Sequence, residues 1–174
     1  MPQTSVTAMP EAVEGLLADD SLTKDCLPAT SEEASAEIPF GVMVCQGTED
    51  DGVLLLNTSS ASMATKLKGV TVFGQGYAKP QELGDTGFKP KCTFDVLNKG
   101  RIYVMVEEAV APGNAVRVRA VAAGAEVKGA FRTTADGTDT VDISKFAKWI
   151  RSAAEDGLAV VEIDMTMSAL AVAD

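Results

Sequence analysis

The stretch that decides the fold runs from Gly100 to Gly124 and reads GRIYVMVEEAVAPGNAVRVRAVAAG. Apolar residues lie on both sides of its central APGN, namely Ile102, Val104 and Val106 before it and Val116, Val118 and Val121 after it. Alternation of apolar and polar residues is typical of a strand with one buried face. Proline sets φ at the first central position of a turn, and glycine tolerates positive φ at the next. The sequence therefore predicts a β-hairpin, in which a strand over residues 101–110 is followed by a strand that begins at Val116.

Short apolar runs of the same kind recur from Ile38 onward. Turn sequences separate them, for example TEDDG at residues 48–52 and ADGTD at residues 135–139. Many short strands with frequent turns are typical of β-sandwiches and jelly rolls. We expect eight or nine strands and at most one short helix, so residues 38–174 are predicted to form a mainly β body with a jelly-roll or β-sandwich fold.

The one helix is predicted over residues 144–156. Phe146, Trp149, Ile150 and Ala153 fall at positions i, i+3, i+4 and i+7. Ser144 is a suitable N-cap and Gly157 a suitable stop. This spacing places the four apolar side chains on one face of an amphipathic helix.

Residues 1–37 have a different composition. They are rich in Pro, Ser, Thr, Asp and Glu, and their apolar residues occur only in short clusters. Such a segment cannot form a core of its own. We expect an extended N-terminal arm that becomes ordered against a partner, and a disordered tail is the alternative.

The composition narrows the classes of function. The chain has 174 residues and a formal net charge of −10, which disfavours binding to nucleic acid and to anionic membranes. We find no apolar run of about 18 residues and no secretory signal pattern. Histidine is absent, which removes Ser–His and Cys–His nucleophile pairs. The three cysteines have neither zinc-site nor disulfide-framework spacing. These absences argue against histidine-based catalysis and a zinc site, while chemistry based on carboxylates or lysines stays possible.

Four segments of the sequence, taken in order, resemble the head decoration, or cement, proteins of tailed bacteriophages. They are GLLADD at 15–20, EEASAEIPFGVMVCQGT at 32–48, NKGRIYVMVEEAVAPGNAVRVR at 98–119 and AAEDGLAVVEID at 153–164. The resemblance implies a β-sandwich or jelly-roll body with an extended segment, no active site and no cofactor. It also implies that residues 145–163 form paired strands, in conflict with the helix predicted above.

The same resemblance implies a role in the virion. Proteins of this kind bind the outer surface of the mature capsid as homo-oligomers, here a dimer or a trimer, and bridge neighbouring subunits of the major capsid protein. The chain would be made in the host cytoplasm. The candidate interface residues are the apolar residues of the arm, the junction between arm and body, and the single tryptophan: Val13, Leu16, Leu17, Leu27, Ile38, Pro39, Phe40 and Trp149.

Other interpretations stay open at this point. Trp149 is equally suited to the core, and Arg117 and Arg119, which share one strand face, suit a solvated face better than pairing with coat protein. An oligomeric β-barrel virion module that binds glycans or a host surface is the alternative function. An aspartate and metal-dependent hydrolase would use Asp136, Asp139 and Asp142, although a polar turn accounts for that spacing.

Overall fold

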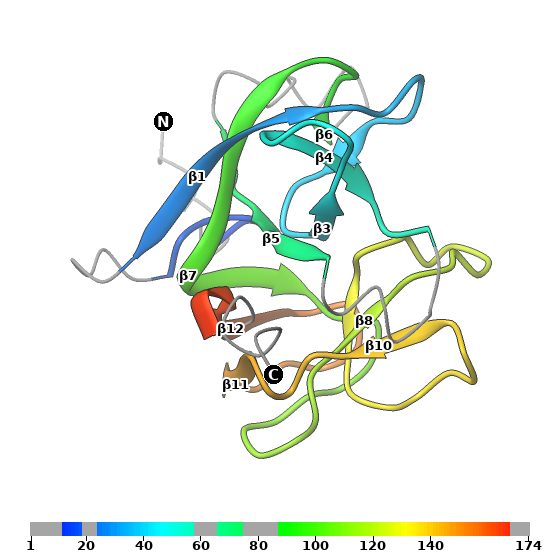
Figure 1. Cartoon of the computed structure of the whole chain (residues 1–174). Helices are drawn as coiled ribbons and strands as arrows, with labels where there is room; N and C mark the ends of the chain where they lie inside the picture. Colours follow the sequence, from blue (N-terminus) through cyan, green and yellow to red (C-terminus); the bar gives the residue numbers. More distant parts are fainter. Residues whose placement is uncertain (1–11, 19–23, 58–65, 75–86, 168–174) are drawn as a thin grey trace, which may run out of the picture.

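The computed structural model describes residues 12–18, 24–57, 66–74 and 87–167 (Figure 1). The prediction of a mainly β protein is confirmed, because the described residues contain strands and a single 3-10 turn, η2 (Met165–Met167). The strands are β1 (Asp25–Ser31), β2 (Ile38–Pro39), β3 (Met43–Gln46), β4 (Gly52–Leu55), β5 (Leu67–Thr71), β6 (Gly87–Phe88), β7 (Thr93–Met105), β8 (Arg117–Arg119), β9 (Phe131–Arg132), β10 (Thr140–Asp142), β11 (Ala147–Arg151) and β12 (Leu158–Asp164).

Five strands close into a small barrel, which occupies the upper half of Figure 1. Their hydrogen-bonded order is β1–β4–β3–β5–β7, and β1 also pairs with β7, so that the ring is complete. The barrel interior contains an apolar cluster in which the ring of Phe88 stacks on Phe94 and meets Phe40 edge-on. Closure stabilises these strands because it removes the free edges that an open sheet exposes.

Strand β3 separates the barrel interior from a second core. Val44 belongs to the barrel cluster, whereas Met43 and Cys45 belong to the other. A strand covered on both faces reads as a continuous apolar run rather than an alternating one. The sequence VMVC at residues 42–45 therefore fits its position in the wall between the two cores.

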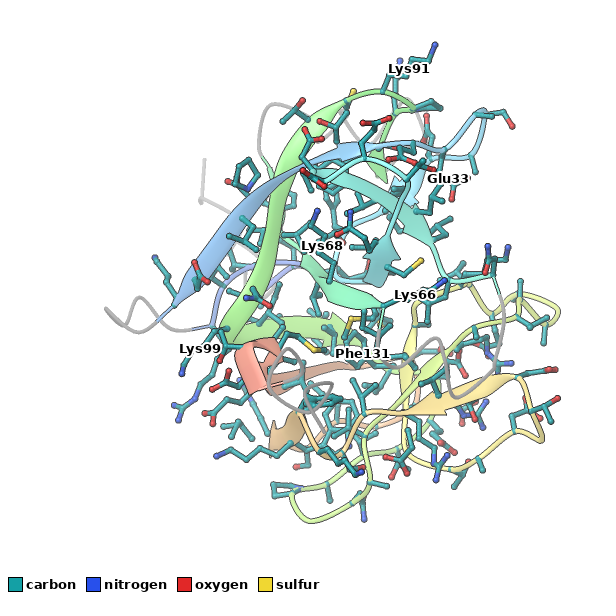
Figure 2. The ribbon with its side chains drawn as sticks, viewed as in Figure 1. Glu33, Lys66, Lys68, Lys91, Lys99 and Phe131 are labelled. Carbon is teal, nitrogen blue, oxygen red and sulfur yellow. The ribbon has the colours of Figure 1, made fainter. Side chains whose placement is uncertain are left out.

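The second core lies in the lower half of Figure 1. β7 is long enough to belong both to the barrel and to the sheet over the second core. Its residues up to Lys99 pair with β1 and β5, and its residues from Lys99 to Met105 pair with β12. β11 adds to the far side of β12, and the three-stranded sheet β10–β8–β9 contributes side chains to the same core. Phe131, labelled in Figure 2, meets Trp149 edge-on there, with ring centroids 6.3 Å apart. This part of the body is a two-layer, sandwich-like arrangement.

The hairpin predicted on either side of APGN is wrong in its pairing. Its first segment forms the end of β7 and pairs with β12, while its second forms β8 and pairs with β9 and β10. The turn itself is present: the Asn114 N–H donates to the Ala111 carbonyl at 3.0 Å, and the Asn114 Oδ1 accepts from the Ala111 N–H at 2.8 Å. The turn leads the chain from one sheet to the other. Alternation reveals a buried face but does not choose the neighbouring strand.

The helix predicted over residues 144–156 is also wrong. Residues 147–151 form β11, which pairs antiparallel with β12 and places Trp149 opposite Val161. The register shifts between Trp149 and Arg151, which marks a bulge or irregularity. Pairing with a long neighbouring strand outweighs one favourable stretch of helical spacing. The resemblance to cement proteins correctly implied paired strands here.

The predicted arm, residues 1–37, is described only in part, because residues 1–11 and 19–23 lie outside the described residues. Residues 25–31 form β1 and close the barrel through pairing with β7 and β4. This portion is therefore ordered by its own chain rather than by a partner. The division into an arm and a body that begins at Ile38 stays a prediction for the remainder.

Candidate interface

Three of the predicted interface residues lie inside the protein. Ile38 and Phe40 belong to the barrel cluster, and Trp149 belongs to the second core. The indole Nε1 of Trp149 donates a hydrogen bond to the Ala115 carbonyl at 3.0 Å. Each of these side chains packs within one of the two cores and is almost fully buried in this structure.

The N-terminal segment contributes exposed apolar side chains. Val13 and Leu16 are each 39% exposed and Leu27, on β1, is 36% exposed. Leu17 is half-buried, packs against the second core and forms an isolated bridge with Ile102. Monomer surfaces commonly carry single exposed apolar residues, so their grouping is what matters.

Residues 12–18 are fixed to the body at Gly15. Its N–H donates to the Tyr103 carbonyl at 2.8 Å, and its carbonyl accepts from the Phe73 N–H at 2.7 Å. Gly15 has a φ of 74°, and an added Cβ would lie 2.9 Å from the backbone nitrogen of Gly41. Only glycine meets both requirements without strain. Val13, Glu14 and Leu16 are therefore presented from a well-anchored backbone.

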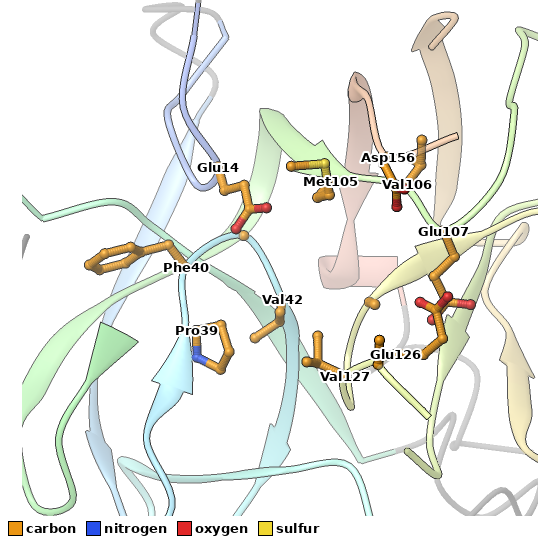
Figure 3. A pocket seen from close by; sticks show the side chains of 13 residues that line it. Glu14, Pro39, Phe40, Val42, Met105, Val106, Glu107, Glu126, Val127 and Asp156 are labelled. Atoms are coloured by element: carbon orange, nitrogen blue, oxygen red, sulfur yellow. The ribbon is translucent and has the colours of Figure 1, made fainter. Parts of the chain in front are cut away.

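A groove of about 170 Å³ lies beside this segment, where the barrel meets the second core (Figure 3). Small-molecule sites usually measure roughly 300–1,000 Å³, so the groove suits one inserted side chain better than a metabolite. It is lined by the N-terminal segment, the β2–β3 connection, the end of β7 and two turns, through Glu14, Pro39, Phe40, Gly41, Val42, Met105, Val106, Glu107, Ala125, Glu126, Val127, Ala130 and Asp156.

Short backbone contacts fix the walls of the groove. The Met43 N–H donates to the Gly129 carbonyl at 2.9 Å, which ties the 125–130 turn to the barrel. On the opposite wall, the Asp156 N–H donates to the Val106 carbonyl at 3.0 Å. The groove is therefore a feature of the folded body and not of a loose loop.

Three carboxylates that line the groove, those of Glu14, Glu126 and Asp156, lack partners among the described residues. Burial raises the pKa of Glu14, and burial, followed by the charge of Glu107, raises the pKa of Glu126. Among the described residues neither side chain makes a hydrogen bond or an ion pair. A partly desolvated carboxylate without a cation is unfavourable by itself, and a cation placed beside it would relieve the cost. The sequence predictions did not single out either residue, although Glu14 stands out as an acid set among Val13, Leu16 and Leu17.

The fourth carboxylate, Glu107, is fully occupied. Its oxygens accept two hydrogen bonds from Arg119, at 2.6 and 2.8 Å, and one from Arg132 at 2.9 Å. Arg119 is only 2% exposed, so the expectation that it lies on a solvated strand face is wrong. Arg117 is partly exposed and pairs with Asp142 at 2.7 Å.

Two of the three aspartates considered as a metal site, Asp136 and Asp142, form ion pairs instead. Asp136 pairs with Arg119 at 3.1 Å and with Arg132 at 3.5 Å, and Asp142 pairs with Arg117. Within the described part of the chain, no group of three or more metal-ligating side chains comes together. None of the helical residues described forms a segment long and apolar enough to cross a membrane.

The closed barrel, the second core and a small apolar groove bearing carboxylates define a mainly β protein whose surface suits contact with another protein. Residues 1–164 match the family described as "Structural cement protein (E217 gp24/Pam3 gp6)". The chain therefore belongs to the family of phage structural cement proteins, which places it in the virion as part of the capsid.

A solved structure supports the fold. A chain from "The capsid of Myoviridae Phage XM1" is 14% identical, covers 94% of this chain and 98% of its own length, and superimposes with a TM-score of 0.64. No curated protein sequence matches the chain. At this identity the likeness concerns the fold, and it extends over both the barrel and the second core.

Proposed function

We propose that this protein binds the outer surface of the mature phage capsid as a homo-oligomer and cements neighbouring subunits of the major capsid protein. Family membership supports a structural role in the capsid. Cementing requires contact area and several attachment points rather than chemistry, because gripping several coat subunits at once adds avidity. The body suits a protein that is attached at several points, because hydrogen bonds between strands distant in sequence close its barrel.

The observation that carries the proposal is the exposed apolar face of the N-terminal segment. Val13 and Leu16 project from a backbone that Gly15 anchors to β7 and to the residues after β5. Apolar side chains held on a rigid base lose little conformational entropy on binding, which favours affinity. Standard interfaces bury about 800 Å² per partner, so these residues would form part of a larger contact.

Binding to phage heads that lack the cement protein tests the proposal. Purified chain is co-sedimented with such heads, and the double variant Val13→Ser/Leu16→Ser is compared with the unmodified protein. We expect saturable binding by the unmodified protein and at least about tenfold weaker binding by the variant, since two apolar contacts are lost. Val121→Ser, at another exposed valine, is the matched control and should bind normally.

Deleting the predicted arm would not be an equivalent test. A chain that begins at Ala36 lacks β1, and the barrel loses the strand that joins β4 to β7. Its failure to bind would report unfolding. Absence of saturable binding by the intact protein, in contrast, would contradict the proposed function.

A further inference from the structure

We infer that the groove between the barrel and the second core receives a lysine or arginine side chain from an apolar segment of the coat protein. The inference rests on the proposed function and specifies the chemistry of the partner at one site. It joins three observations: exposed apolar residues at the rim, carboxylates that no described residue pairs with, and a cavity sized for one side chain.

The rim of the groove is apolar and exposed. Met105 is 39% exposed and Val127 is 45% exposed, and Figure 3 shows both side chains beside the groove. Val13 and Leu16 flank Glu14 on the adjoining segment. Three of the six exposed large apolar side chains in the described residues, Met105, Val127 and Val13, thus lie on or next to groove-lining residues. The aliphatic stem of a lysine or arginine packs well against such surface.

The negative charge of the groove favours binding of a cation. Glu14, Glu126 and Asp156 line it, and no ion pair among the described residues neutralises them. The two arginines nearby, Arg119 and Arg132, are already paired with Glu107 and Asp136. An entering cation would face the half-buried Glu14 on one wall and Glu126 on the other, as Figure 3 shows. Charge pairs that become desolvated on binding contribute more than pairs at a solvated rim.

Charge also favours the coat protein over a second copy as the occupant. Each copy carries a formal net charge of −10, so an acidic groove is a less favourable contact for a second copy than for a basic partner, and self-association would use other surfaces. Several cations of the chain are held internally, as in Lys99–Asp164, Arg101–Glu162 and Arg117–Asp142. A basic segment on another polypeptide meets no such penalty.

The test compares head binding by full-length variants. Glu14→Gln/Glu126→Gln keeps the shape of both side chains and removes two charges. We expect the Kd for cement-free heads to rise about tenfold, and binding to become less sensitive to salt. The matched control is Glu49→Gln/Asp50→Asn, which removes two charges from the exposed β3–β4 turn at the other end of β3. It should leave the Kd within about twofold of normal, because that turn is remote from the groove.

Thermal unfolding shows whether a variant binds heads weakly because it has lost the groove charges or because it is less stable. The groove variant should melt at the same temperature or higher, since it removes unpaired, partly buried charges. Val127→Arg provides a second variant at an exposed groove-lining position. We expect its guanidinium to compete for the groove carboxylates and to weaken head binding similarly.

The outcomes are distinct. If the unmodified protein binds heads and both groove variants bind equally well, the inference is overturned while the proposed function stands. If the unmodified protein does not bind, both fail. If the variants change self-association in sedimentation velocity and leave head binding unchanged, the occupant is a second copy and the inference is wrong.

Discussion

At the scale of single residues, Glu107 is the buried carboxylate that forms ion pairs with two guanidinium groups. It is 5% exposed, and Arg119 and Arg132 both donate to its oxygens. The hydrogen bonds between Arg119 and Glu107 are the largest of the effects that raise the pKa of Arg119. The guanidinium of Arg119 therefore stays charged. Sequence alternation placed Arg119 correctly on a strand but could not show that the acid lies 12 positions earlier in the chain.

We expect Glu107→Gln to destabilise the fold by about 3 kcal/mol, because the buried Arg119 loses its buried carboxylate partner and keeps only the half-exposed Asp136. Arg119→Met should cost less, since Glu107 keeps its contact with Arg132. Urea unfolding of both variants gives the two free energies. Equal losses would contradict this account of the cluster.

At the scale of elements, closure of the barrel depends on a close approach between β5 and β7. An added Cβ at Gly69 would lie 2.2 Å from the Leu97 carbonyl oxygen and 2.7 Å from Val96 Cγ1. The register between β3 and β5 also shifts beside this glycine. The sequence LKGV reads as an ordinary strand with one weak position, so this contact becomes visible only in the folded chain.

Gly69→Ala should destabilise the protein by about 3 kcal/mol, because backbone atoms block the new methyl group and cannot move aside cheaply. Gly124→Ala is the control: Gly124 has a φ of 62° and Gly69 a φ of 155°, both positive, but nothing lies within 4 Å of a Cβ added at Gly124. It should cost only about 1 kcal/mol. Equal unfolding free energies for the two variants would show that the β5–β7 approach is not the constraint.

The strands also show which features of the fold the sequence predicts and which it does not. Residues 101–105 and 117–119 are strands as predicted, because alternation reports a buried face directly. Their partners were predicted wrongly, because pairing is decided by contacts distant in sequence. The same cause overturned the helix around Trp149, where β12 supplies a ladder that local spacing cannot reveal. Of the candidate interface, Val13, Leu16 and Leu27 are exposed, whereas Ile38, Phe40 and Trp149 are core residues.

At the scale of the whole molecule, strands β3 and β7 contribute side chains to both cores, and the N-terminal segment lies across the junction. The strands of the barrel are hydrogen-bonded on both sides, so the barrel has no free edge at which it could begin to open. The surface features with unmet interactions, the apolar rim and the unpaired carboxylates, lie at the same junction. This arrangement is what we expect of a clamp on a neighbouring protein.

The most direct measurement of the cementing role is scanning calorimetry of cement-free phage heads with and without saturating protein. Because a ligand that binds only the intact shell stabilises it by mass action, the account predicts a higher disruption temperature that rises with protein concentration until the sites are filled. The control is the Val13→Ser/Leu16→Ser variant, which should require higher concentrations for the same shift. Saturable binding that leaves the disruption temperature unchanged would contradict the account, since the protein would then decorate the capsid without cementing it.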